Sequence, residues 1–396
     1  MPIAHFVTLD GIDISPWVMG ADIDILIPTS NENFVQQCDL TLSNVSGRFD
    51  GAISAPGFGD TINPQSKIVV VLYSIEYSRS INDPDVYVTL AFAGLAQKVD
   101  QGYTTVKVNA GTTDTNANGY LSKDIHKHNG QPTGPALREV LAMYNLPAGT
   151  IQIPTGMEKR EWEFMRDQSG KGVLDFLSDW DGQETYVNEY GKVMHVPPGV
   201  AGTNPDYTGR MKLPAQSESA VGFCDKVLVR GGSFINAKEP GAELLPSDAV
   251  GYETNQSDLA TILANENGEG GADAAAEMVA NYGWIRAPTF FFPDCTTQEE
   301  CQKRAIRLLA RYITYWKRSM PAVVGRSPKL RSLIQYRYPR LIDQAWQLST
   351  WFTGRVVRCK TNYSPKMGWV SYNEIQPFVI NSANSANIYG ASELGT

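Results

Sequence analysis

One sequence pattern occurs twice in this chain, about 260 residues apart. Residues 92–96 are Phe-Ala-Gly-Leu-Ala and residues 352–356 are Phe-Thr-Gly-Arg-Val, so both have the form Phe-x-Gly-x-small apolar residue. Each copy precedes a turn and a second run of β-forming residues, at 102–106 and at 368–372. This order is typical of a β-hairpin. The repeat therefore predicts a similar β-module in each half of the chain, marked by Phe92, Gly94, Phe352 and Gly354.

The composition favours a large β-rich protein. The chain has 396 residues, enough for two or three domains with filled cores, and it contains 35 Gly, 23 Pro, 18 Tyr and 14 Phe. Only 19% of residues are charged, and the net charge of -8 argues against a general nucleic-acid binder. No apolar stretch of about 18 residues is present, so no membrane span is expected. The N-terminus also lacks the basic region and apolar core of a secretory signal.

Cysteine and histidine do not form a recognisable metal motif. The five cysteines are scattered, and the closest pair, Cys295 and Cys301, is six residues apart. His126 and His128 have no third ligand near them in the sequence. We expect reduced thiols, no metal site and no cofactor.

The first 210 residues divide into a β part and a mixed part. Residues 1–110 contain about six or seven predicted strands, including a hairpin at Asp10-Gly11 and an apolar central strand at 67–73, which suits a small barrel or sandwich. Residues 111–210 contain helical patterns at 136–144 and 173–180 and a hairpin at 185–196. We interpret residues 111–210 as an inserted α+β domain.

Residues 211–380 are predicted to form the second β-module. It contains an acidic segment, 236–281, expected to be an extended surface loop with one short helix. A long amphipathic helix is predicted over 297–318, with Thr296 or Thr297 as its N-cap. Residues 381–396 form a polar tail. The predicted fold class is mainly β, with two similar small β-barrel modules flanking an α+β domain.

Charge is distributed unevenly around the predicted helix. Between Glu239 and Glu300 there are 12 acidic residues and one basic residue, whereas between Lys303 and Arg340 there are 11 basic residues and no acidic one. Four arginines fall within about 60° of arc on the helix, opposite an apolar stripe. Two interpretations remain open: a solvated face, or a surface facing an assembly partner, a lumen or passing nucleic acid. The four residues are Arg304, Arg307, Arg311 and Arg318.

No set of residues supports catalysis. The best carboxylate cluster is Asp175, Asp179, Asp181 and Glu184, but its spacing is that of a helix face followed by a turn rather than of two acids across a cleft. The four histidines give no persuasive Ser-His-Asp arrangement, and nucleotide-binding and metalloprotease motifs are absent. We therefore predict a protein that is not an enzyme.

The order of these features resembles the tail-hub (baseplate hub) proteins of tailed bacteriophages and contractile injection systems. Besides the two Phe-x-Gly hairpins, the resemblance rests on the strand and turn at 38–44, the hairpin around 190–193, and the Tyr-Gly segment at 281–283 that precedes the long helix. The acidic segment 236–281 and the polar tail depart from the pattern.

This resemblance implies a homotrimer and a structural role in the virion. Three chains with two barrels each would present six quasi-equivalent modules, adapting a sixfold tail tube to a threefold central spike. The implied partners are the tail tube protein or a distal-tail protein, the spike protein and the tape-measure protein, with DNA passing through a lumen. The protein would be made in the host cytoplasm and end in the virion tail or baseplate.

Two alternatives stay open at this stage. The first is another β-rich tail component, such as a distal-tail or receptor-binding protein. The second is a carbohydrate-active enzyme or lectin that uses the Trp and Tyr residues, with Asp179 or Asp181 as the test positions.

Overall fold

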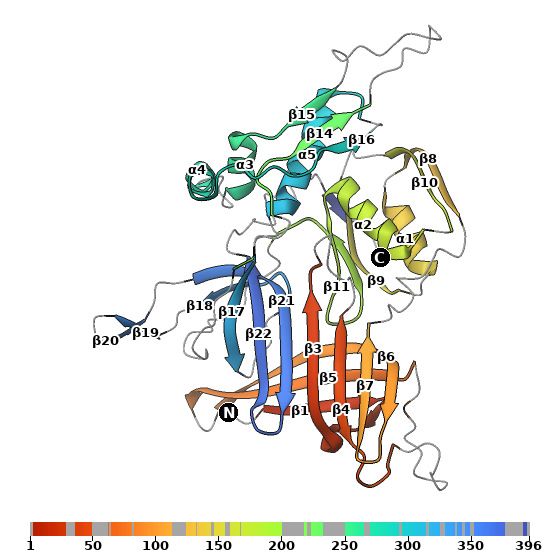
Figure 1. The fold of residues 1–396 in the computed structure, drawn as a ribbon, viewed down its shortest axis with the longest axis vertical. Helices are drawn as coiled ribbons and strands as arrows, with labels where there is room; N and C mark the ends of the chain where they lie inside the picture. The colour runs from red at the N-terminus through yellow and green to blue at the C-terminus, as the bar shows by residue number, and fades with distance from the viewer. Residues whose placement is uncertain are drawn as a thin grey trace.

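The described part of the chain has a β-sheet part and a part in which helices pack on smaller sheets (Figure 1). The computed structural model describes residues 3–28, 36–49, 62, 65–80, 83–112, 124–131, 133–143, 146–154, 159–166, 168–199, 218–219, 223–232, 250–264, 270–292, 295–313, 317–324, 329–336, 339–342, 345–348, 352–376 and 391–393.

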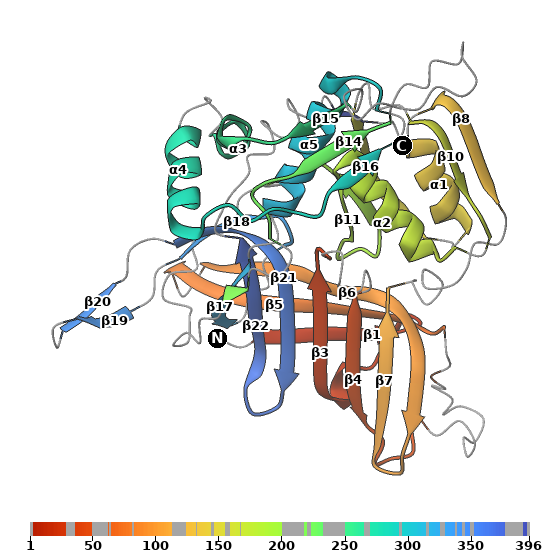
Figure 2. The same cartoon turned by 45° about the horizontal axis from the view of Figure 1, so that its top comes forward.

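The β part is a 12-stranded sheet with the order β13-β17-β22-β21-β3-β4-β7-β6-β5-β1-β2, and with β18 paired to β21. The views in Figures 1 and 2 show β1, β5 and β6 crossing behind β3, β4 and β7, so the sheet folds over its own core. Its strands are β1 (Ile3–Leu9), β2 (Ile12–Asp13), β3 (Val18–Leu26), β4 (Gln37–Ser43), β5 (Lys67–Ser80), β6 (Asp83–Gln101), β7 (Thr105–Gly111), β13 (Glu218–Ser219), β17 (Lys317–Val324), β18 (Leu333–Tyr336), β21 (Phe352–Ser364) and β22 (Gly368–Gln376).

Alternating side chains build the core of this sheet. In β4, Cys38, Leu40 and Leu42 are buried while the residues between them face outward, as the period of two requires. Phe92 and Trp369 are buried in the same hydrophobic cluster. Full burial of one such side chain stabilises the fold by about 1.5–3 kcal/mol, so the cluster is the main source of stability in the β part.

The two Phe-x-Gly segments form β-hairpins with the same register. Residue Leu95 pairs with the last residue of β7, and Arg355 pairs with the last residue of β22. In each hairpin the register then shifts by one residue, between Ala96 and Lys98 and between Val356 and Arg358. The predicted hairpins are therefore confirmed, and the repeat extends to the position of a β-bulge.

The prediction of two small β-barrels is not confirmed. β21 pairs with β3 from Ala21 to Leu26, so the strands carrying both hairpins belong to one continuous open sheet. Within the residues that the structure describes, no closed barrel is found. Local strand patterns do not specify which strands become neighbours, and this long-range pairing joins the two expected modules.

The α+β part has its own core, formed where α1 (Thr133–Met143) and α2 (Gly170–Asp181) meet small sheets. The predicted helices and the hairpin at 185–196 are present, and Ser169 caps α2 by accepting a hydrogen bond from the Gly172 amide. Residues 391–393 of the predicted tail form a strand paired with β9. The strands here are β8 (Ile125–Gln131), β9 (Ala148–Pro154), β10 (Lys159–Phe164), β11 (Glu184–Val187), β12 (Val193–Val196) and β23 (Ala391–Glu393).

A third hydrophobic cluster lies among the helices and strands of residues 223–313. Here a sheet of β15 (Gly251–Glu253), β14 (Leu228–Gly231) and β16 (Phe290–Phe292) packs against α5 (Gln298–Ile313). The acidic segment 236–281 contains two helices, α3 (Gln256–Leu263) and α4 (Gly271–Tyr282), whereas the sequence predicted a single short one. Residues 236–249 and 265–269 of this segment lie outside the described chain. The described chain also contains a short 3-10 helix (Ser15–Trp17) and the hairpin β19 (Pro339–Ile342) with β20 (Ala345–Leu348).

Helix α5 begins as predicted but ends earlier. Thr297 accepts a hydrogen bond from the Glu300 amide while the Glu300 carboxylate accepts one from the Thr297 amide, which is a capping box. The helix stops at Ile313, and Arg318 lies on β17. The next three residues of the sequence, Thr314, Tyr315 and Trp316, have a lower intrinsic helix propensity than Ala, Leu or Arg and lie outside the described residues. None of the helices in the described chain combines the length and apolar character needed to cross a membrane.

Candidate functional site

The arginine stripe of α5 lies at the contact between α5 and α2. Arg304, Arg307 and Arg311 are only 4, 3 and 5% exposed. The Arg304 guanidinium lies 3.7 Å from the centroid of the Trp180 ring and donates a hydrogen bond of 3.1 Å to the Trp180 carbonyl. Arg311 forms an ion pair with Asp179. These contacts hold two parts of the same chain together.

This location corrects both interpretations of the stripe. α5 is buried on both sides, because its apolar residues belong to the cluster of residues 223–313 and its arginines contact α2. A Cβ atom at Gly182 would lie 2.6 Å from the Arg307 Cβ atom, so the backbone after α2 approaches α5 closely. The three arginines therefore do not form a solvated face or a free docking surface, and Arg318 is on a different element.

We predict that Arg311→Glu lowers the free energy of unfolding by about 2–3 kcal/mol, because it places a carboxylate at the buried position of Arg311 and beside the carboxylate of Asp179. Urea denaturation of the purified chain measures this change. Lys303→Gln is the matched control on the same helix: Lys303 pairs with Glu299 at the surface, where a loss of about 0.3 kcal/mol is expected. Equal small losses in both variants would contradict a structural role for the stripe.

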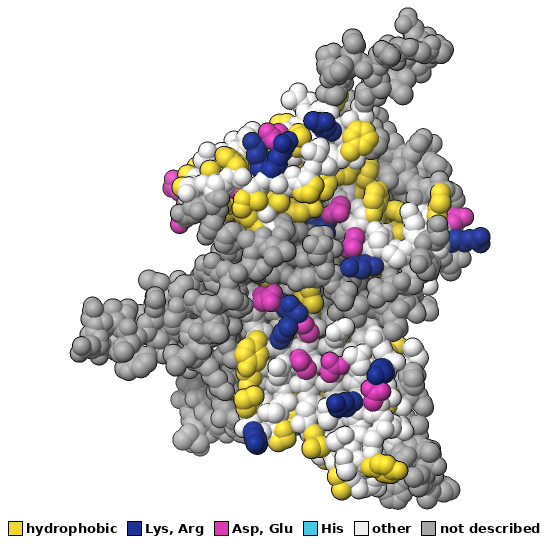
Figure 3. All heavy atoms as spheres, in the orientation of Figure 1, with side chains coloured by type: hydrophobic (Ala, Val, Ile, Leu, Met, Phe, Trp, Pro, Cys, Tyr) yellow, Lys and Arg dark blue, Asp and Glu magenta, His cyan; other side chains and the backbone are white. Residues whose placement is uncertain are grey.

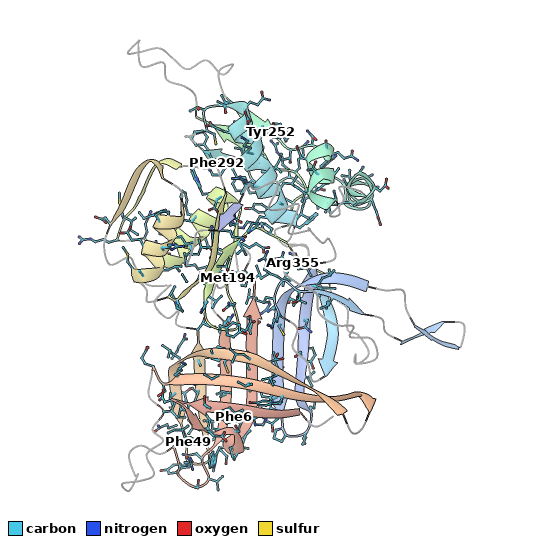
Figure 4. All side chains as sticks on the ribbon, turned by 180° about the vertical axis from the view of Figure 1, so that it is seen from behind. Phe6, Phe49, Met194, Tyr252, Phe292 and Arg355 are labelled. Carbon is cyan, nitrogen blue, oxygen red and sulfur yellow. The ribbon has the colours of Figure 1, made fainter. Side chains whose placement is uncertain are left out.

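A buried ionic cluster joins the α+β part to the large sheet. Arg355 of β21 is fully buried and donates to both carboxylate oxygens of Glu184 in β11, and also to the Gln376 side chain at 2.9 Å. Arg331 lies 3.7 Å from the same carboxylate and donates to the carbonyls of Gly199 and Pro197. Figure 4 shows Arg355 where the sheet meets the α+β part.

Burial and charge act in opposite directions in this cluster. Burial lowers the pKa of the Arg355 guanidinium, and the adjacent Glu184 carboxylate works against that shift. Burial likewise raises the pKa of the Tyr186 hydroxyl, on the same strand as Glu184. The hydrogen bonds between the Arg355 guanidinium and the Glu184 carboxylate offset the cost of burying both groups.

Sequence reasoning missed this cluster, although one signal was available. Arg355 occupies the position at which the first Phe-x-Gly segment has Leu95. An arginine where the first copy has an apolar residue is unusual, and a guanidinium that becomes buried requires a partner; that partner is Glu184.

The candidate catalytic carboxylates do not converge on a cleft. Asp179 pairs with Arg311, Glu184 pairs with Arg355, and burial raises the pKa of Asp175. Asp179 and Glu184 therefore serve separate local contacts.

Asp181 belongs to a buried network that contains the residue types of a catalytic triad. The His195 imidazole contacts the Asp181 carboxylate at 3.0 Å and the Thr185 hydroxyl at 2.7 Å, and Thr185 contacts Ser178. All four side chains are buried, and Ser178 donates to the Leu174 carbonyl. The hydroxyls of Ser178 and Thr185 are buried and so cannot reach a substrate. The network instead links the end of α2 to the β11–β12 hairpin through hydrogen bonds.

Three aspartates lie on the outer face of β3 and β4, with Asp22 directly opposite Asp39. Loss of hydration in this face and the carboxylates of Asp24 and Asp39 raise the pKa of Asp22. Asn109 donates a hydrogen bond of 2.6 Å to Asp39. Like charges directly opposite each other destabilise a strand pair, so the pair weakens the sheet at neutral pH.

Asp22→Asn is expected to raise the free energy of unfolding at pH 7 by about 0.5 kcal/mol. Because folding raises the pKa of Asp22, the stability of the wild type relative to the variant increases as the pH falls through that pKa, and the advantage of the variant vanishes below about pH 4. Thermal unfolding between pH 3 and 8 tests this. Asp100→Asn, which removes a surface partner of Lys98, should give no gain at pH 7.

The described residues provide no metal centre. No group of three or more His, Cys, Asp and Glu side chains within them could hold an ion. All five cysteines are described, and each is buried and outside any disulfide. His126 and His128 lie on β8.

Comparison with known proteins identifies the fold. No protein-family model and no curated protein matches the sequence. The structure is similar to that of the prophage MuSo2 43 kDa tail protein from Shewanella oneidensis, with a TM-score of 0.55, 12% identity and coverage of 97% of this chain and 99% of the other. It is also similar to a tail protein from Neisseria meningitidis MC58, with a TM-score of 0.57, 9% identity and the same coverage. The chain therefore has the fold of phage tail proteins, as the sequence resemblance predicted.

Proposed function

We propose that this chain is a structural tail protein, and that three copies form a hub which adapts a sixfold tail tube to a threefold spike. The fold shared over nearly the whole chain with a prophage tail protein and with a second tail protein supports the structural role. The finer proposal rests on the two Phe-x-Gly hairpins.

The matched hairpins are the observation that carries the proposal. Both place the unpaired residue of the bulge three residues after glycine and pair the residue after glycine with the end of the returning strand. Two similar elements in one chain become six in a trimer, which is the number that a sixfold ring requires. The two equivalent hairpins are marked by the residues of the repeat, Phe92, Gly94, Phe352 and Gly354.

The proposed partners follow from this position in the tail. On one side the hub would contact the tail tube protein or a distal-tail protein, and on the other side a central spike protein. The tape-measure protein and then DNA would pass along the axis of the trimer. The protein would function in the virion after synthesis in the host cytoplasm.

A non-enzymatic role agrees with the contacts of the acidic residues. The carbohydrate-active alternative depends on Asp179 and Asp181, and these carboxylates are engaged by Arg311 and His195. These ion pairs favour a structural role for the Asp179 and Asp181 carboxylates.

Native mass measurement of the purified chain tests the proposal. A stable particle of three chains is expected at micromolar concentration. A single chain at every concentration, ionic strength and pH tested would overturn the hub assignment. A monomer that assembles only on a purified tail tube would favour another tail component.

A further inference from the structure

The outer face of the β15-β14-β16 sheet is exposed and carries aromatic and cationic side chains. Val229 and Phe292 of its strands face inward and are buried, as are Val227 and Ala287 in the segments that precede β14 and β16. On the other side, Phe291 is 64% exposed and Trp284 is 42% exposed. Figure 3 shows hydrophobic and basic side chains gathered on this lobe. We call this set the sheet face; its residues are Lys226, Leu228, Arg230, Trp284, Arg286 and Phe291.

The sheet face has an excess of positive charge. Lys226 and Arg286 both pair with Glu253, at 3.3 and 3.1 Å, and Lys226 lies 5.4 Å from the centroid of the Trp284 ring. Within the described chain, Arg230 has no ion pair, although it lies beside Phe291 in the parallel ladder. A solvent-exposed site with two aromatic rings and a cation outside any ion pair is typical of a binding surface.

A complementary surface lies on α4 of the same lobe. Ala272, Ala276 and Ala280 are exposed at a spacing of four residues, and Asp273 and Glu277 are exposed beside them, while Ala275 and Met278 pack into the core. Neither carboxylate forms an ion pair with a described residue. We call the five exposed residues the α4 face. Its small side chains allow close approach, and its two carboxylates match the charge of the sheet face.

The two faces point in different directions. In Figures 1 and 2, α4 lies at one end of the lobe, whereas β14 and β16 lie on its front. A chain cannot therefore bring its own two faces together. Complementary surfaces at different places on one molecule produce a head-to-tail contact between copies, which closes into a ring when the rotation permits.

We propose that the sheet face of one copy binds the α4 face of the next copy. This inference rests on the proposed trimer and identifies one of its interfaces. Phe291 and Trp284 would pack over the exposed alanines, and Arg230 would pair with Asp273 or Glu277. A second copy is favoured over single-stranded nucleic acid, because Glu253 pairs with two cations of the sheet face and the net charge of -8 opposes a polyanion.

Charge reversal on each face, alone and combined, tests the contact. Arg230→Glu is expected to weaken trimer association by about tenfold, and Asp273→Lys/Glu277→Lys by about a hundredfold. The triple variant, which exchanges the charges, should recover at least about tenfold relative to the α4 variant. Dilution series by native mass measurement or sedimentation provide the values. Phe291→Ser should weaken association without altering its salt dependence.

Matched controls separate assembly from folding. Lys107→Glu/Lys192→Glu reverses two exposed charges elsewhere and should leave association unchanged. Because the substituted residues are exposed, urea midpoints should stay close to that of the wild type.

The possible outcomes distinguish this inference from the hub proposal. A wild-type trimer that survives both reversals, or a triple variant without recovery, would refute the contact and leave the hub proposal intact. Binding of a fluorescent oligo-dT that Arg230→Glu abolishes, with trimer association unaffected, would assign the sheet face to nucleic acid instead. A wild-type protein that is always a single chain would refute both proposals.

Discussion

Arg355→Met is expected to lower the free energy of unfolding by about 3–5 kcal/mol, the cost of leaving the carboxylate of Glu184 buried without its main partner. The remaining contact with Arg331, at 3.7 Å, is too long to replace two direct hydrogen bonds. The loss should separate the α+β part from the large sheet, because the pair joins β11 to β21. Urea denaturation followed by intrinsic fluorescence measures the change.

Arg358→Met provides the matched control, three residues further along β21. Arg358 pairs with Asp24 and Glu374, but its side chain is 22% exposed, so the expected loss is about 1 kcal/mol. A double variant, Glu184→Met/Arg355→Met, should be more stable than Arg355→Met because it removes the unpaired charge as well. If Arg355→Met and Arg358→Met cost the same, the buried cluster does not have the role assigned to it.

Gly94→Ala is the second substitution with a large expected effect, about 3 kcal/mol. An added Cβ atom would lie 2.5 Å from the Phe92 ring and 2.7 Å from the carbonyl carbon of Gly111 on β7. Backbone paired in a sheet cannot move aside without breaking its ladder, so the strain falls on the first hairpin. Denaturation of the purified variant gives the loss, and native mass measurement shows whether assembly fails with it.

The other copy of the pattern predicts a smaller effect. At Gly354 an added Cβ would lie 2.8 Å from the terminal methyl carbon of Ile375, which can change rotamer, and 2.9 Å from the Gln376 carbonyl oxygen. Both distances are longer than those at Gly94, so Gly354→Ala should cost about 1–2 kcal/mol. Gly20→Ala is the neutral control, since no atom outside its chain neighbours approaches closer than 3.8 Å. A greater loss at Gly354 than at Gly94 would contradict this ranking.

Features governed by local chemistry were predictable from the sequence. The hairpins follow from glycine, turn residues and alternating β-formers, and the start of α5 follows from Thr297 and Glu300, whose side chain and amide groups satisfy each other. The same applies to α2, whose N-cap is Ser169. Each of these depends on residues within about four positions of one another.

Features governed by long-range pairing were not predictable. Arg304, Arg307 and Arg311 have the spacing of an exposed charged face, and only the docking of α2 makes that face an interior one. The pairing of β21 with β3 likewise replaced two expected barrels by one sheet. Partner choice depends on contacts separated by more than a hundred residues, about which hydrophobic periodicity carries no information.

The pairing of β21 with β3 also constrains how the chain can be made. Arg358 hydrogen-bonds to Asp24 across 334 residues of sequence. Strand β3 therefore cannot pair with β21 until nearly the whole polypeptide has been synthesised. Until then β3 presents an unpaired edge to other nascent chains, which exposes it to aggregation. A chain that ends before residue 352 would lack β21 and would leave this edge of β3 unpaired.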